Sequence, residues 1–217
     1  KKYLRLIKRI PWLKMVGIWN SISMNCSTKD SDIDLFIVTS ENSMWLNRLL
    51  ITLIFQLFWV RKTSKKHAWR FCLSFFATTS WLNFWDFALK NDIYLYFWIV
   101  YFIPLVSKDD TYELFLEENE KWADFRDYKW LFKIKKNTSP QSSPYRRGSI
   151  NDLSLLIIPA PVRRELGWGI KKIFLPKTLK TYNKLWKPFG VIIGDNMLKF
   201  HDKDIRKEIQ NELYWKK

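Results

Sequence analysis

The feature that most constrains the fold is a short apolar run that begins with two aspartates. Residues 28–38 read TKDSDIDLFIV, and the part from Ile33 to Thr39 is dense in β-branched and aromatic side chains, as is typical of a buried strand. Side chains alternate along a strand, so Asp32, Asp34 and Phe36 face the same side. The Cα atoms of the two aspartates then lie about 7 Å apart, and their carboxylates repel each other unless a cation stands between them. That cation is either a lysine or arginine side chain or a hard divalent metal ion.

The segments around this strand indicate a mixed α/β core. Leu13–Trp19 reads as a preceding strand, and residues 20–31 form a polar loop rich in turn-forming residues. Ser40 is placed to cap a helix from Glu41 to about Val60, and Arg70–Phe76 reads as a third strand.

Further along the chain, the sequence predicts helices and then a change of composition. Residues 81–88, 93–106 and 110–122 read as helical, and residues 137–149 read as a flexible linker because they are rich in Ser and Pro. Beyond the linker we expect short helices capped by Asp195 or Asp202, and a last helix over residues 203–215. The chain is therefore divided into a core (1–108), a helical continuation (109–136), the linker (137–149) and a basic, mainly helical C-terminal extension (150–217).

The charge of the chain favours a polyanionic partner. Lys and Arg number 37 against 21 Asp and Glu, which gives a formal net charge of +16. Such a balance favours nucleic acid, nucleotide phosphates or an anionic membrane surface. Basic side chains gather between Ile150 and Lys184, where we expect either contact with a nucleic-acid backbone or a solvated face.

The apolar runs and the cysteines bear on the compartment. Residues 49–60 and 93–106 are the longest apolar runs and fall short of the roughly 18 residues that a spanning helix needs. We therefore expect no integral membrane segment, with a peripheral membrane protein as a rival interpretation. Cys26 and Cys72 lie in unrelated contexts, which argues against a disulfide framework or a zinc site and for a reducing, cytoplasmic setting. Cys72 is expected to be an inert core residue.

The paired aspartates belong to a longer pattern. A strand, VGIWNS, ends in Asn20-Ser21, a loop follows, and the next strand reads SDIDLFIV from Ser31 to Val38. This arrangement resembles the nucleotidyltransferase superfamily related to DNA polymerase β, whose usual pattern is a strand ending in Gly-Ser, a loop, and a Ser-Asp-x-Asp-aliphatic strand. The resemblance covers about residues 13–60, and the rest of the chain resembles bacterial proteins that carry this domain. It implies a polymerase-β-like α/β (α+β) core, a small mixed sheet flanked by helices.

The resemblance also implies a reaction and the residues that perform it. Asp32 and Asp34 would be the catalytic and metal-binding carboxylates, which hold Mg²⁺ or Mn²⁺. An acceptor hydroxyl on a nucleic-acid end, a protein or a small molecule would attack the α-phosphate of an NTP and release pyrophosphate. The Ser21 hydroxyl and N–H would hold the β- and γ-phosphates. Four loop residues would bind the nucleotide: Asn20, Ser21, Lys29 and Ser31.

This sequence departs from the superfamily pattern at three places. Asn20 replaces the Gly, and Met24 replaces a common Arg; Asn tolerates positive φ best among residues other than Gly, so Asn20 and Asn25 are expected to keep the shape of the loop. A third carboxylate is normally expected on a later strand, but the face of Arg70–Phe76 that carries Cys72 holds no acid. Two interpretations follow: an enzyme that works with two carboxylates, or a catalytically silent module of the same fold that binds nucleic acid or a partner protein.

Overall fold

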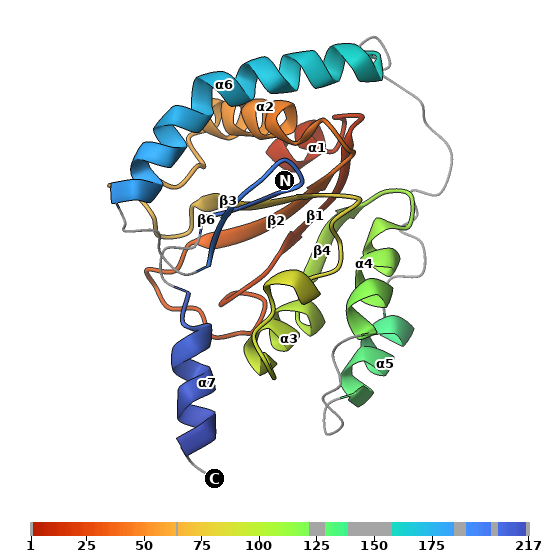
Figure 1. Ribbon diagram of the computed structural model, residues 1–217, viewed down its shortest axis with the longest axis vertical. Coiled ribbons are helices and arrows are strands. Elements are labelled where there is room, and N and C mark those ends of the chain that lie inside the picture. Colours follow the sequence, from red (N-terminus) through yellow and green to blue (C-terminus); the bar gives the residue numbers. More distant parts are fainter. Residues whose placement is uncertain are drawn as a thin grey trace.

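A mixed β-sheet of six strands organises the protein (Figure 1). The computed structural model describes residues 2–63, 65–121, 129–138, 158–184, 190–200 and 204–215. The strand order is β4-β1-β2-β3-β6-β5, and only β2 and β3 run parallel to each other. The strands are β1 (Leu13–Ile18), β2 (Ile33–Thr39), β3 (Phe71–Thr78), β4 (Ile103–Ser107), β5 (Val191–Ile193) and β6 (Met197–Phe200). This arrangement confirms the expected mixed α/β class with helices beside a mixed sheet.

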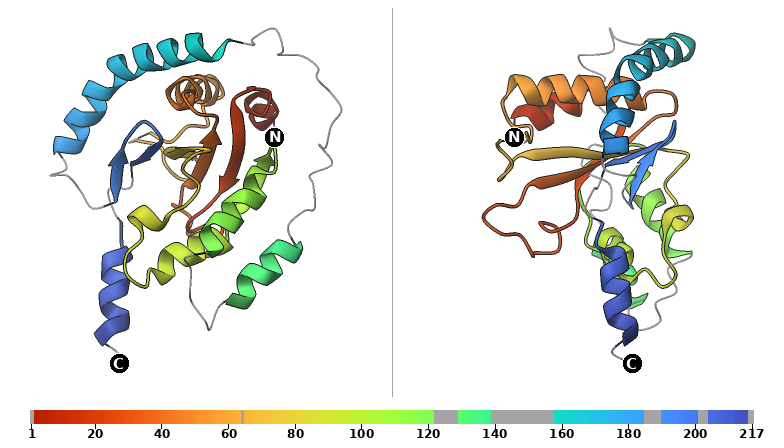
Figure 2. Two further views of the ribbon diagram at one scale, coloured as in Figure 1. Left: turned by 45° about the vertical axis from the view of Figure 1, so that its right-hand side comes forward. Right: turned by 60° about the vertical axis from the view of Figure 1, so that its left-hand side comes forward.

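Helices cover both faces of the sheet, so the molecule has three layers (Figures 1 and 2). On one side lie α1, α2 and α6, and on the other lie α3, α4 and α5. A short 3₁₀ turn, η1 (Trp85–Phe87), precedes α3. The helices are α1 (Lys2–Ile7), α2 (Met44–Leu57), α3 (Ile93–Val100), α4 (Thr111–Glu120), α5 (Lys129–Thr138), α6 (Ala160–Lys184) and α7 (Arg206–Trp215).

The central strand β2 is apolar on both faces because it is covered on both. Leu35 and Ile37 belong to the hydrophobic cluster beneath α1 and α2. Phe36 and Val38 belong to the opposite cluster, which includes residues of α3 and α4. A strand buried on both faces reads as a continuous apolar run rather than an alternating one, which explains the run after Asp34. Asp34 has the same parity as Phe36 and therefore faces the α3 side of the sheet.

The helix after β2 starts later than the sequence predicts. It begins at Met44 instead of Glu41, and the preceding Ser43, not Ser40, stands at its N-cap without a side-chain capping bond. Asn42 takes a positive φ of 58°, a turn conformation that keeps the chain out of the helix. The Ser40 N–H instead donates to the Trp12 carbonyl, so Ser40 ends the strand region.

The prediction of one helix over residues 93–106 is wrong in its second half. Helix α3 ends at Val100, and residues 103–107 form the edge strand β4, which pairs with β1. Pro104 lacks an N–H and is tolerated on an edge strand. Opposite it, Gly17 leaves room for the ring of Phe102, whose Cζ would lie 2.0 Å from a Cβ at that position. The helix predicted over residues 81–88 is likewise reduced to the single 3₁₀ turn η1.

The C-terminal part of the chain contributes strands as well as helices. A hairpin of β5 and β6 occupies residues 191–200, where short helices were expected, and Asp195 lies in its turn. Strand β6 pairs with β3, so residues on both sides of the expected boundary at 150 share one sheet. Helix α6 packs on α2. Asp202 and residues 139–149 of the expected linker lie outside the described residues.

Buried ion pairs attach the C-terminal segment to the core. The Arg206 guanidinium pairs with Asp204 through Nε at 2.8 Å and with Asp92 through Nη1 at 3.0 Å. The Lys199 ammonium lies 2.7 Å from Asp204. All four side chains are at most 2% exposed. Asp92 also accepts the Leu95 N–H at the N-terminus of α3, so the network joins β6 and α7 to α3.

Candidate metal and nucleotide site

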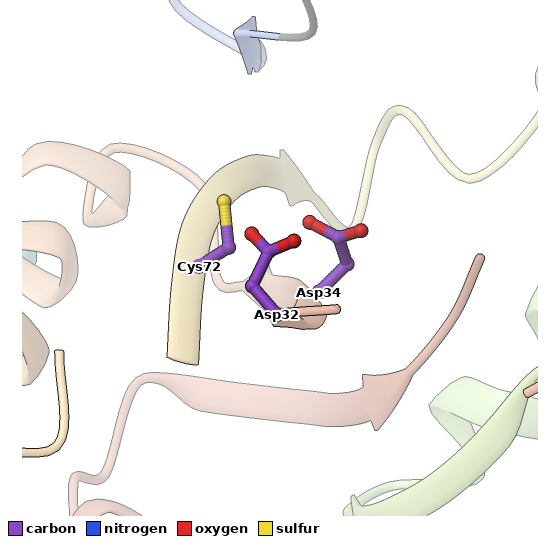
Figure 3. Close-up of side chains that lie close together, drawn as sticks. All are labelled: Asp32, Asp34 and Cys72. Atoms are coloured by element: carbon purple, nitrogen blue, oxygen red, sulfur yellow. The ribbon is translucent and has the colours of Figure 1, made fainter. Parts of the chain in front are cut away.

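The two aspartates lie at the start of β2 with their carboxylates on the same side of the strand (Figure 3). Asp34 is 6% exposed, and Asp32 precedes the strand and is half-buried. The third side chain in this group is Cys72 on β3. One oxygen from each carboxylate and the Cys72 Sγ all lie within 4.8 Å of one another. Within the described part of the chain, no other three His, Cys, Asp or Glu side chains are arranged to hold a metal ion.

Asn20 joins the loop after β1 to this group. Its Nδ2 donates to Asp34 Oδ2 at 2.8 Å, and the Trp19 N–H donates to the Asp34 carbonyl at 3.2 Å. Asn20 and Asn25 take φ values of 68° and 57°, which confirms the prediction that both asparagines adopt a positive φ in this loop. The Met24 N–H donates to the Asn20 carbonyl at 3.1 Å, so the loop begins as a tight turn beside the carboxylates.

A lysine supplies the cation that the paired carboxylates require. The Lys62 ammonium lies 2.7 Å from Asp32 Oδ2, and the Lys62 N–H donates to the Phe71 carbonyl at 2.9 Å, which fixes this residue beside the start of β3. Burial lowers the pKa of Lys62, but the hydrogen bond to Asp32 and the nearby carboxylates outweigh it, so its pKa is raised above the usual value. In the sequence, Lys62 is one of several basic residues between Arg61 and His67, and nothing local marks it as the partner of Asp32.

Cys72 lies on β3, the strand on which the resemblance to the superfamily predicts a third carboxylate. In the parallel pairing of β2 and β3, Cys72 is the register partner of Asp34, so their side chains project from neighbouring strands at the same level. Burial, and then the charge of Asp34, raise the pKa of the Cys72 thiol to about 12. The expectation of an inert core residue did not address the position of Cys72 beside Asp34, which follows from the parallel register of β3 against β2.

Helix α3 contributes one side chain, Tyr94, beside the site. The Tyr94 hydroxyl donates to Asn20 Oδ1 at 3.5 Å, and the Tyr94 ring contacts Trp98 with centroids 5.2 Å apart. Burial raises the pKa of Tyr94. Asn20 is therefore held between the carboxylate of Asp34 and an aromatic side chain that sequence reasoning did not single out.

Three other loop residues are predicted to bind nucleotide: Ser21, Lys29 and Ser31. Ser21 follows Asn20 within the turn, and its carbonyl accepts the Cys26 N–H at 2.8 Å. The Ser31 hydroxyl accepts the Thr28 N–H at 2.8 Å, so this side chain stabilises the turn at residues 28–31. Lys29 is exposed, and it takes no part in the ion pair that Lys62 makes with Asp32.

Several of the basic side chains of α6 are already engaged within the protein. Arg163 stacks on the Trp12 ring with its Cζ 5.5 Å from the centroid, and Lys171 pairs with Asp195. Lys172 covers the ring of Trp168 with its Nζ 3.3 Å from the centroid. The side chains of Arg164, Lys172 and Lys180 are nevertheless exposed, although Lys172 also covers the Trp168 ring.

Comparisons with known proteins found no match for this chain. No protein-family model matches the chain, and no curated protein or solved structure matches it. Among the described helices, none combines the length and the hydrophobicity that crossing a membrane requires.

Proposed function

We propose that the protein is a nucleotidyltransferase that binds an NTP with Mg²⁺ at Asp32 and Asp34 and transfers a nucleoside monophosphate to an acceptor hydroxyl. The observation that carries this proposal is the joint placement of the two carboxylates and the Asn20 turn. One carboxylate is buried and held by Asn20, the other is half-buried, and both face the same side of β2. The resemblance of the sequence around Asn20-Ser21 and Ser31–Asp34 to the polymerase-β-related superfamily supports the same assignment.

The donor set fits a divalent cation that arrives with a nucleotide. Mg²⁺ is bound in proteins by one or two carboxylates and completes its shell with waters and substrate phosphates. Asp32 and Asp34 supply that number of carboxylates, and Mn²⁺ suits the same ligands. When bound, the cation would neutralise phosphate charge and stabilise the attacking and leaving oxygens. The Lys62 ammonium must leave Asp32 for the cation to bind, which its partial exposure of 42% permits.

The residues of the chain would bind and orient the substrate. Asn20 holds Asp34 in one orientation, so this carboxylate loses little side-chain freedom when a ligand binds. The Ser21 hydroxyl and N–H lie in the adjacent turn and would donate to the β- and γ-phosphates. Lys62, once released from Asp32, would stabilise negative charge on the triphosphate, and so would Lys29, an exposed residue of the loop that precedes Asp32. The net charge of +16 favours a large anionic acceptor such as a nucleic-acid end.

A labelled-nucleotide assay tests the proposal. The protein is incubated with labelled ATP, CTP, GTP or UTP, with Mg²⁺ or Mn²⁺, and with RNA, DNA or protein acceptors. Transfer should be lost in Asp32→Asn and Asp34→Asn, because each removes a cation ligand while preserving side-chain volume. Asp30→Asn is the matched control, since Asp30 is an exposed carboxylate of the same loop. Equal transfer by the wild type and both site variants would refute the proposal.

A second function is favoured by one specific observation, the thiol at the position opposite Asp34. A module with the same fold but without catalysis would bind nucleic acid or a partner protein and would need no third carboxylate. Calorimetry with Mg²⁺ and a non-hydrolysable NTP separates the two functions, because the silent module should show no metal-dependent nucleotide binding. The variant Cys72→Asp adds a further test: it supplies a carboxylate opposite Asp34, so an active enzyme should transfer label faster and a silent module should stay silent.

A further inference from the structure

We propose that Asp32, Asp34 and Cys72 form a mixed carboxylate–thiolate site that prefers a divalent cation of the zinc class to Mg²⁺. The inference rests on the proposed function for the location of the cation, and it goes beyond that function in the identity of the cation and in the role of Cys72. Cys72 would then be a metal ligand, although its local sequence is that of a core strand.

The first support is the convergence of three ligand atoms of the appropriate kinds. The two carboxylates come from the start of β2 and the thiol from the neighbouring strand β3, and all three point into the same space (Figure 3). Zinc-class ions accept both carboxylate oxygen and cysteine sulfur at about 2.0–2.3 Å, which places ligand atoms about 3.5 Å apart in a tetrahedron. Small side-chain rotations bring atoms that lie within 4.8 Å of one another to that spacing. Three protein ligands leave a fourth position open for water or a phosphate oxygen.

The second support is that the cluster already attracts a cation. The Lys62 ammonium lies 2.7 Å from Asp32 and occupies the charge position that a metal ion would take. Asp34 is held by the Asn20 amide, the kind of outer hydrogen bond that orients a ligating carboxylate. Asp32 and Lys62 are partly exposed, so an ion reaches the cluster from solvent by displacing the lysine.

The choice between metals follows from the sulfur. Mg²⁺ takes oxygen ligands and gains nothing from Cys72, whereas thiolate ligands select zinc-class ions. On binding, the metal–sulfur bond replaces the sulfur–hydrogen bond, and the thiol proton passes to solvent. The same cluster is therefore expected to hold a zinc-class ion with three ligands and Mg²⁺ with two.

Cobalt provides a direct probe, because Co²⁺ occupies zinc-class sites and a bound thiolate gives a charge-transfer absorption band. The purified protein is stripped of metal with a chelator and titrated with Co²⁺ in the absence of nucleotide. The wild type should develop this band, excess Zn²⁺ should abolish it, and equimolar Mg²⁺ should leave it unchanged. Cys72→Ser should lose the band and bind Co²⁺ at least about tenfold more weakly. Cys26→Ser, the matched control for an exposed free thiol, should retain both.

A further variant keeps the test decisive if Cys72→Ser does not fold. Lys62→Met leaves all three ligands in place and removes the competing ammonium, so it should show the wild-type band with about two- to fivefold tighter Co²⁺ binding. A wild type without a charge-transfer band, a band that persists in Cys72→Ser, or displacement of Co²⁺ by equimolar Mg²⁺ overturns the inference.

The two proposals fail in distinguishable ways. Metal-dependent nucleotide binding with no cobalt–thiolate band leaves the proposed function intact and refutes the role of Cys72. A cobalt–thiolate band without nucleotide binding supports the metal site and refutes the nucleotidyltransferase proposal.

Discussion

Replacement of Arg206 by methionine tests whether the buried ion pairs hold the C-terminal segment on the core. Arg206 donates to Asp204 through Nε and Nη2, and to Asp92 and the Phe87 carbonyl through Nη1 at 3.0 Å each. Methionine fills a similar volume but offers no donor. In this variant, Asp204 retains its ion pair with Lys199, and Asp92 retains the hydrogen bonds donated by the N–H groups of Leu89 and Leu95. Neither carboxylate is therefore left without any partner.

The expected magnitude follows from the burial of the network. Removal of one member of a buried ion pair typically costs about 3–5 kcal/mol, because the remaining charge is left incompletely compensated. The partners that Asp92 and Asp204 retain place the expected loss for Arg206→Met near the lower end of that range. With an m-value near the upper end of about 1–3 kcal/mol/M, the urea midpoint should fall by about 1 M.

The assay is urea unfolding followed by tryptophan fluorescence and by circular dichroism. Arg164→Met makes the same substitution at an exposed position of α6 and should change stability by no more than about 0.5 kcal/mol. Because Asp92 caps α3, which carries Tyr94 against Asn20, Arg206→Met should also weaken nucleotide binding if the proposed site is correct. A free-energy change below about 1 kcal/mol for Arg206→Met would refute the reasoning that this network anchors the C-terminal segment.

Three further predictions concern the loop, the thiol and the basic helix. Asn20→Ala should cost about 1–2 kcal/mol in thermal unfolding because alanine resists the positive φ of this position, whereas Asn20→Gly should preserve stability. Both variants lose the hydrogen bond to Asp34 and should weaken metal-dependent nucleotide binding, so unchanged binding in both would contradict the positioning role of Asn20. The pKa of Cys72 is raised from 9.0 to about 12 in the folded protein, so the unfolded chain loses the thiol proton at lower pH and the free energy of unfolding should fall between pH 9 and 12. Urea midpoints measured across this range should fall more steeply in the wild type and in Cys26→Ser than in Cys72→Ser, and equal slopes would exclude this linkage. A triple variant of α6 should reduce the slope of log affinity for single-stranded RNA against log salt by about 2 in fluorescence anisotropy; it combines Arg164→Ala, Lys172→Ala and Lys180→Ala. Lys133→Ala, at an exposed position of α5, should leave the slope unchanged, and an unaltered slope in the triple variant would place any RNA contact elsewhere.

Local sequence was sufficient for the elements whose side chains settle their own structure. The run after Asp34 is apolar on both faces, and that pattern predicts a strand in the middle of a layered sheet wherever the rest of the chain lies. The asparagines at positions 20 and 25 adopt positive φ through their own conformational tolerance, and the prediction of a turn there was correct. The same-face placement of Asp32 and Asp34 likewise follows from the alternation of one strand.

Long-range pairing decided what local pattern left ambiguous. A continuous apolar run such as residues 93–106 suits a buried helix and a buried strand equally, and the break at Val100 follows from the pairing of β4 with β1. Residues 197–200 become a strand because β3 offers them an edge, although the two segments lie more than a hundred residues apart in the sequence.

The same division applies to the candidate site. The sequence by itself determined the two carboxylates, their common face and the turn beside them, because each depends on neighbours in the chain. Only the tertiary structure placed the Cys72 thiol opposite Asp34 and the Lys62 ammonium on Asp32. Both placements depend on the register of β3 against β2, and register is set by the packing of the whole sheet rather than by any one strand.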